Sequence, residues 1–252
     1  MIKVAKPTAI PKVLLTKGLA ETTNNCTLYD RTPALYHNSK SKFTISGTIY
    51  NADSVKASLK KAQHKKCCFC EKTQADEYGA VEHYRPKGAY KSKRKAKLKK
   101  PGYYWLGYLW DNLFFVCGPC NTKKGSLFPL KDETKRVINH HGNVNQELPL
   151  LLNPTGRKDP TKHIKFTNQF ISGISPEGKN TIEICKLDRD GLNEERKKLL
   201  DELDERITII ISGKDPSAVL RAKKYVQNSI KKDASFSAMA MDYLKSLNFV
   251  IT

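Results

Sequence analysis

The chain has 252 residues, 39% of them hydrophobic, so it is long enough to bury a substantial core. Its 45 lysines and arginines outnumber 25 acidic residues, and the formal net charge of +20 favours polyanionic partners such as nucleic acid. No apolar run approaches the roughly 20 residues that span a bilayer, and lysines and prolines interrupt the N-terminus in a way that secretory signals do not. We therefore expect a cytoplasmic protein without a membrane partner.

The first half of the chain changes character near residue 50. Residues 1–50 show no strong periodicity and contain three prolines, so we expect an extended arm. A helix is predicted over 52–63, where apolar residues recur on one face. The pattern over 81–124 predicts a strand, a basic loop, a second strand at 112–117 and a short helix.

The second half of the chain predicts a small sheet followed by helices. Alternating segments separated by turn residues predict a small antiparallel sheet, formed by 163–167, 170–175 and 180–187. Helical periodicity then predicts helices over 192–210, 216–232 and 236–247.

Positive charge is concentrated between Arg85 and Lys100. Nine of these sixteen residues are basic and none is acidic. From Lys186 onward, by contrast, 13 basic residues are nearly balanced by 11 acidic ones. We expect the basic segment to be a mobile loop that follows nucleic-acid phosphates.

Four of the seven cysteines form two CxxC pairs, Cys67 with Cys70 and Cys117 with Cys120. In a reducing compartment such pairs are metal ligands rather than disulfides, and two of them can place four thiolates around a structural zinc. The 46 residues between the pairs exceed the spacing of a compact zinc ribbon, which indicates an insertion. Redox chemistry at one pair is the alternative, and Cys68 competes with Cys67 for the ligand position.

The insertion carries Glu82 and His83, and Asn121 follows the second cysteine pair. Phosphodiester hydrolysis needs a base that activates water and a cation against the developing negative charge. His83 is the candidate base, and Glu82 and Asn121 offer hard oxygen ligands for Mg²⁺. Neighbouring residues of a strand point to opposite faces. Glu82 and His83 can therefore serve one site only if the strand bends or ends there, and the nearby Pro86 is consistent with such an end.

The segments EHYRPK and WDNLFFVCGPCNTKKG resemble the HNH endonuclease signature in its four-cysteine form. The resemblance implies a ββα-metal core, in which a hairpin and a helix hold one catalytic Mg²⁺ or Mn²⁺. It implies that His83 is the general base and that Asn112 braces the loop carrying it. Asn121 and Glu82 would bind the metal, although the family commonly has Asp at the latter position. Lys124 matches the lysine of the family's CNxxK ending.

The segments LLNPTGRKDPTKHIKF and TIEICKLDRDGLNEER extend the similarity to the HNH nuclease subunit of Septu-type anti-phage systems, also found beside some retrons. This resemblance implies a partner ATPase of the ABC/SMC type. The expected fold is α+β, with a C-terminal region of small antiparallel sheet and helices. It divides into an arm, a nuclease core with zinc knuckles and this mixed region, over 1–50, 51–130 and 131–252.

The predicted function is metal-dependent endonuclease activity in anti-phage defence, with DNA favoured over RNA. Nucleic acid is expected to contact Arg85, Lys87 and Lys124. The alternative is a non-catalytic zinc module that binds nucleic acid or protein. The pair His83 and Asn121 separates the two, because binding alone needs neither a base nor a ligand for a hard cation.

Overall fold

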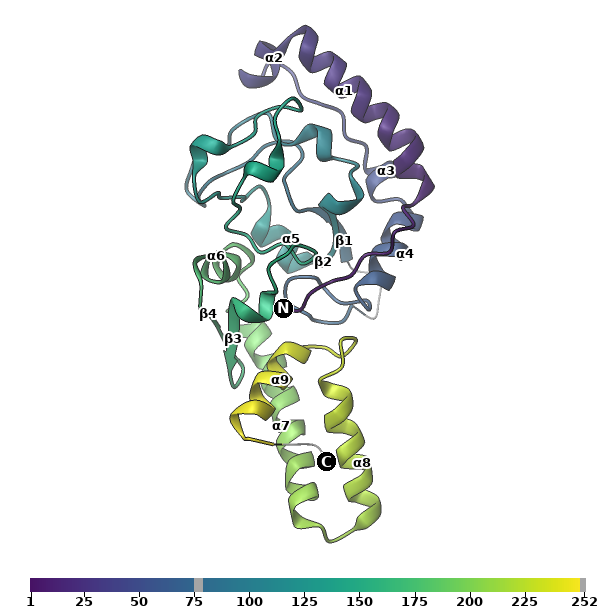
Figure 1. Ribbon diagram of the computed structural model, residues 1–252, viewed down its shortest axis with the longest axis vertical. Coiled ribbons are helices and arrows are strands. Elements are labelled where there is room, and N and C mark those ends of the chain that lie inside the picture. Colours follow the sequence, from purple (N-terminus) through teal and green to yellow (C-terminus); the bar gives the residue numbers. More distant parts are fainter. Residues whose placement is uncertain (75–78, 250–252) are drawn as a thin grey trace.

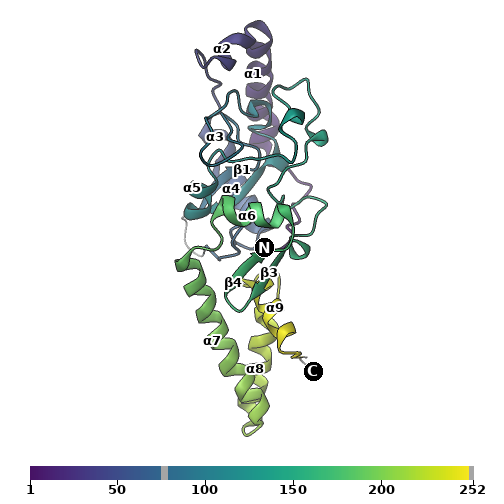
Figure 2. The ribbon, with the colours of Figure 1, turned by 90° about the vertical axis from the view of Figure 1, so that its left-hand side faces the viewer.

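The molecule is elongated, with a helical hairpin projecting from one end of a larger body (Figures 1 and 2). The hairpin consists of α7 (Asp190–Ser212) and α8 (Pro216–Ser229). A computed structural model describes residues 1–74 and 79–249. None of the helices in these ranges combines the length and apolar character needed to cross a bilayer.

The body contains short helices and two antiparallel hairpins. Its helices are α1 (Leu19–Arg31), α2 (Pro33–His37), α3 (Gly47–Tyr50), α4 (Asp53–Ala62), α5 (Gly118–Lys124) and α6 (Pro176–Cys185). Its strands pair as β1 (Gly79–His83) with β2 (Leu113–Cys117), and β3 (Ile164–Thr167) with β4 (Phe170–Gly173). The last helix, α9 (Ser237–Ser246), packs against β3. The predicted α+β class with small antiparallel sheets is confirmed.

The hairpin β1–β2 and helix α5 form the centre of the body. Every residue of β2 is buried, as expected for its continuous apolar run. Helix α5 begins immediately after β2, and Pro119 occupies its first turn, where a missing backbone N–H costs little. The predicted order of strand, strand and short helix over 81–124 is therefore confirmed.

The N-terminal segment is helical over much of the range predicted as an extended arm. Residues 1–11 contain no helix or strand, but helical structure begins at residue 12. A π-helical turn, Leu14–Gly18, leads into α1, and Pro33 then begins α2. The prediction was wrong over residues 12–37 and 47–50, which are almost entirely helical. Prolines before a helix or at its first position do not interrupt it.

Contacts with the rest of the body stabilise α1, which has little apolar character of its own. Tyr29 is buried and stacks on Tyr104, with ring centroids 5.4 Å apart. At Gly18 the backbone approaches Tyr108 so closely that an added Cβ would lie 2.9 Å from the Tyr108 Cβ. Helix formation here depends on tertiary packing rather than on a local periodic pattern.

In the C-terminal region, segment 180–187 is largely helical rather than a strand. It is mostly the second half of α6, whose N-terminus is capped by Ser175 accepting from the backbone N–H of Gly178 at 3.1 Å. Thr181, Ile182 and Cys185 are buried on this helix at the spacing of one face. The other two segments form the β3–β4 hairpin as predicted, and α7, α8 and α9 match the three predicted helices.

Candidate active site and metal centre

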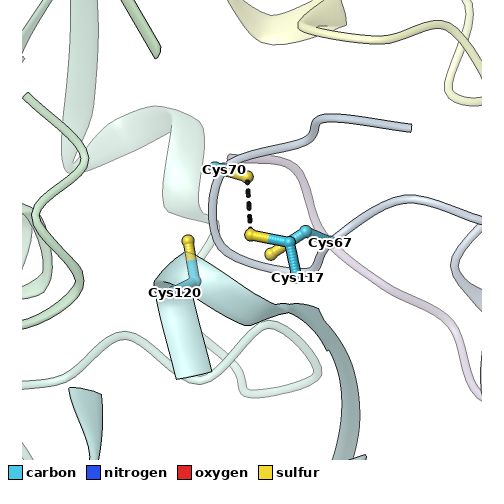
Figure 3. A group of neighbouring side chains, drawn as sticks. All are labelled: Cys67, Cys70, Cys117 and Cys120. Atoms are coloured by element: carbon cyan, nitrogen blue, oxygen red, sulfur yellow. Dashed lines mark hydrogen bonds between the residues drawn. The ribbon is translucent and has the colours of Figure 1, made fainter. Parts of the chain in front are cut away.

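The two CxxC pairs meet in the structure (Figure 3). Cys67 and Cys70 come from the loop after α4, Cys117 ends β2, and Cys120 lies in the first turn of α5. All four are buried, their Sγ atoms lie within 4.8 Å of one another, and those of Cys70 and Cys117 are 3.7 Å apart. A tetrahedral zinc with Zn–S bonds of about 2.3 Å requires sulfur separations of about 3.8 Å. The four-cysteine group therefore fits a zinc ion, and Cys68 lies outside it.

The four thiols differ in how readily they ionise. Hydrogen bonds from Cys120 and Cys67 lower the pKa of the Cys117 thiol, which is the direction that metal ligation requires. Burial raises the pKa of Cys67, and the hydrogen bond with Cys117 raises that of Cys120. The guanidinium Nη1 of Arg189 donates to the Sγ of Cys120 at 3.7 Å. Arg189 precedes α7, so this contact joins the C-terminal region to the core. Sequence reasoning missed Arg189, because no spacing relates it to the cysteine pairs.

His83 is the last residue of β1, and its side chain is almost completely buried. Its Nε2 lies 2.9 Å from the carbonyl oxygen of Gly107, which only accepts, so Nε2 carries the proton. Burial, aided by the positive charge of Lys87, lowers the pKa of His83 to about 3, so the ring is neutral near pH 7. Nδ1 is then unprotonated, and it has no hydrogen-bond partner within residues 1–74 and 79–249.

Glu82 and His83 line the same open cleft, which has a volume of about 480 Å³. Both reach it because β1 ends at His83, as the position of Pro86 predicted. The N-terminal segment also contributes to the cleft, through Tyr36, Ser41, Lys42 and Phe43. Tyr50 of α3 packs its ring edge-on to the His83 ring, with centroids 4.6 Å apart. These contributions were missed because no local motif marks them.

Asn112 connects the end of β1 to the loop that presents Gly107. Its Oδ1 accepts from the backbone N–H of Arg85 at 2.7 Å. Its Nδ2 donates to the carbonyls of Arg85 and Leu106 at 3.1 and 3.0 Å. The side chain is buried and fully used in holding these two segments together, which is the placement that a bracing role requires.

Lys124 is buried and lies between α5 and β1. Its Nζ donates to Glu82 Oε1 at 2.6 Å and to the His83 carbonyl at 2.8 Å, and its side chain is 0% exposed. This position contradicts the predicted contact with nucleic acid, because a side chain enclosed by the core cannot reach a phosphate. Asn121 is half-buried three residues earlier on α5, a spacing that puts it on the same side of the helix.

Two curated relatives are similar to this chain. Septu protein PtuB of Bacillus mycoides (strain KBAB4) is 33% identical over 204 residues, which cover 77% of this chain and 68% of the relative. The chain belongs to the Septu PtuB family. Septu protein PtuB of Bacillus thuringiensis is 28% identical over 144 residues, or 56% of this chain and 44% of the relative. No protein-family model matches the sequence. The predicted Septu-type relationship is confirmed, and the HNH assignment stays a prediction.

Arg85 and Lys87, the other two residues predicted to contact nucleic acid, lie in different surroundings in this PtuB-family chain: Arg85 packs on the core, and Lys87 lines the cleft. Arg85 donates through Nε to Glu147 Oε2 at 2.8 Å, and its guanidinium packs 5.4 Å from the ring centre of Phe128. Arg85 therefore serves the core, which does not fit the predicted contact. Lys87 lines the cleft, where its Nζ lies 4.3 Å from the Tyr50 ring centre. The contact of Lys87 with nucleic acid stays a prediction.

The basic segment is attached to the body of the PtuB-family fold rather than forming a free loop. Tyr90 and Lys99 pair through two backbone hydrogen bonds of 3.0 and 2.9 Å. The guanidinium of Arg94 donates to the carbonyls of Lys123 and Glu183. The segment nevertheless leaves several lysines exposed, namely Lys93, Lys95, Lys97 and Lys99.

Proposed function

We propose that this PtuB-family chain is a metal-dependent, HNH-type endonuclease that hydrolyses nucleic-acid phosphodiester bonds, DNA in preference to RNA, in anti-phage defence. The observation that carries the proposal is the state of His83. Its imidazole is neutral, one nitrogen is held by the Gly107 carbonyl, and the other is left to accept a proton at the cleft that Glu82 also lines.

His83 would act as the general base through Nδ1, taking a proton from the water that attacks phosphorus. The Gly107 carbonyl continues to accept from Nε2–H and stabilises the imidazolium that forms. A phosphodiester in the cleft adds negative charge beside the ring, which raises the pKa of His83 and improves it as a base. Asn112 would keep Gly107 and the end of β1 in register during this step.

Glu82 and Asn121 are the residues that would hold a catalytic Mg²⁺ or Mn²⁺. A carboxylate and an amide oxygen are the hard ligands that such ions bind. Lys124 engages one Glu82 oxygen, Oε1, and so fixes the orientation of the carboxylate. When bound, the ion supplies positive charge against the phosphate oxygens and the leaving group. The cysteine group, enclosed in the core, would hold a structural zinc.

The exposed lysines of the basic segment should supply non-specific affinity for nucleic acid. Each phosphate contact contributes about 0.9 to the slope of log affinity against log salt on duplex DNA. Replacing Lys93, Lys95 and Lys97 by glutamine should flatten that slope by up to about 3 and weaken binding to all sequences alike. The matched control replaces Lys214, Lys231 and Lys245, which are also exposed but lie in the C-terminal helical region. Equal salt slopes for both triple variants would contradict the assignment.

We also propose that an ATPase of the ABC/SMC type binds this chain through the α7–α8 hairpin. The hairpin projects from the body (Figure 2) and exposes Ile211 and Leu220 near its tip, by 74% and 70%. Residues 1–40 are a poorer candidate for the ATPase-binding surface, because Leu14, Tyr29 and Tyr36 belong to the buried core.

The co-expressed pair should elute together in size-exclusion chromatography, and Ile211→Asp with Leu220→Asp should separate the two proteins. Leu148→Asp, an exposed leucine of the body, is the control.

For the nuclease activity, the co-expressed pair is incubated with plasmid DNA or total RNA, in Mg²⁺ or in chelator. Cleavage that requires Mg²⁺ is expected. Binding without cleavage under every condition would favour the non-catalytic zinc module, and separate elution of the wild-type proteins would exclude the partner.

A further inference from the structure

Asp30, His140 and His141 form a second group of possible metal ligands, remote from the cysteines in sequence. Asp30 lies near the end of α1, and the histidines lie in the loop that crosses it. The Nε2 of His141 is 2.8 Å from Asp30 Oδ1, and the Nε2 of His140 is 3.4 Å from Asp30 Oδ2. One ligand atom from each residue lies within 4.8 Å of the others. The three side chains thus converge on one point.

The separations suit a transition-metal ion. Zinc lies about 2.0–2.2 Å from imidazole nitrogen and carboxylate oxygen. At angles between 90° and tetrahedral, that distance places neighbouring ligand atoms about 3.0–3.5 Å apart. The two observed N–O separations, which run to different oxygens of Asp30, are 2.8 and 3.4 Å, and one ligand atom from each of the three residues lies within 4.8 Å of the others. The side chains of Asp30 and His141 are 48% and 64% exposed, which leaves coordination positions open to water.

A buried hydroxyl orients one of the histidines. The Oη of Tyr104 lies 2.6 Å from His140 Nδ1, and Tyr104 is completely buried. Metal-binding histidines commonly have the second ring nitrogen held by such a partner, which fixes the tautomer and directs the other nitrogen at the metal. Tyr104 can accept from Nδ1–H and leave the Nε2 lone pair of His140 facing Asp30.

The loop itself presents both imidazoles to the same side. Asn139 Oδ1 accepts from the backbone N–H of His141 at 3.0 Å, and the two histidine rings lie 4.1 Å apart. Asn139 Nδ2 also donates to the hydroxyl of Tyr29 on α1. The turn is therefore fixed against α1 independently of any ion. Exposed histidine–carboxylate contacts alone contribute little to stability.

We propose that Asp30, His140 and His141 bind one divalent transition-metal ion of the Zn²⁺ type, separate from the cysteine group. The ion would add a second connection between the loop and α1, beside the contact that Asn139 already makes with Tyr29. The ion would also help to hold one wall of the cleft in place. Tyr104, which contacts His140, stacks on Phe43 with ring centroids 3.9 Å apart, and Phe43 lines the cleft. The site does not depend on the proposed nuclease activity.

The test is calorimetric titration of Zn²⁺ into the full-length chain, purified with its cysteine group loaded and dialysed into metal-free buffer. One further Zn²⁺ per chain should bind, and metal analysis after the titration should count it. Asp30→Asn and His141→Ala should each weaken this binding by at least about ten-fold, and Tyr104→Phe by about 10–100-fold, as losses of orienting partners do elsewhere.

His64→Asn is the control, because His64 is an exposed histidine elsewhere with φ of +52°, a conformation that asparagine tolerates. It should bind Zn²⁺ as the wild type does. Circular dichroism of every variant checks that the fold is retained. The proposal is overturned if the wild type takes up no second ion, or if Asp30→Asn and His141→Ala bind it as tightly as the wild type.

Discussion

Replacing His83 by alanine should lower the rate of Mg²⁺-dependent cleavage by about 10²–10⁴-fold, the usual contribution of a general base. Affinity for nucleic acid should change little, because in the proposed mode of binding the phosphates contact lysines of the cleft and basic segment rather than the buried ring of His83. The measurement is single-turnover cleavage of plasmid DNA by the chain together with its proposed ATPase partner, beside a binding titration in chelator.

Loss of the buried His83 ring also removes the hydrogen bond to Gly107, so stability is measured in the same samples. His83→Gln restores much of the side-chain volume and serves as a second variant that separates lost packing from lost chemistry. His64→Asn controls for changes in an exposed histidine. Cleavage at the wild-type rate by a folded His83→Ala protein would remove this residue from the mechanism.

Replacing any of Cys67, Cys70, Cys117 or Cys120 by serine should reduce the zinc content of the purified chain below one ion and destabilise the body. Structural zinc sites in small fingers contribute about 10–16 kcal/mol, as much as the whole stability of about 5–15 kcal/mol of a typical domain. Even a fraction of that loss should appear as insolubility or as an earlier urea transition. Metal analysis and urea unfolding provide the measurements.

Cys68→Ser is the matched control for the zinc ligands. Cys68 is buried beside Cys67 but lies outside the four-cysteine group. Its replacement should leave one zinc per chain. Full zinc content in the Cys67→Ser protein together with loss in Cys68→Ser would reverse the assignment of the two residues. Absence of zinc from the wild-type chain would disprove the structural metal.

The local sequence pattern was sufficient to predict several parts of this fold. The apolar run of β2, the CxxC spacings and the helical periodicity of α7 are each set by neighbours along the chain, and each reappears in the structure. Strand alternation and the position of Pro86 likewise indicated that Glu82 and His83 share a site only at a strand end, and both line one cleft. Such features are readable because backbone geometry repeats over a few residues.

Contacts between distant segments determined the features that the local sequence pattern did not predict. Helix α1 lacks a strong apolar stripe and is stabilised by packing on Tyr104, so an extended arm was the natural expectation. Lys124 and Arg85 look like surface cations in sequence, but Glu82 and Glu147 turn them inward. Burial of a charge depends on where its partner lies, which composition does not specify.

The two groups of metal ligands differ for the same reason, because one follows from local spacing and the other from long-range packing. The cysteine group was predictable because each pair is spaced by two residues and a turn brings its sulfurs together. Asp30 and His141 are 111 positions apart in the chain, and only the packing of α1 against the loop brings them within hydrogen-bond distance. Arg189 beside Cys120 and Tyr50 beside His83 are further long-range pairs of this kind.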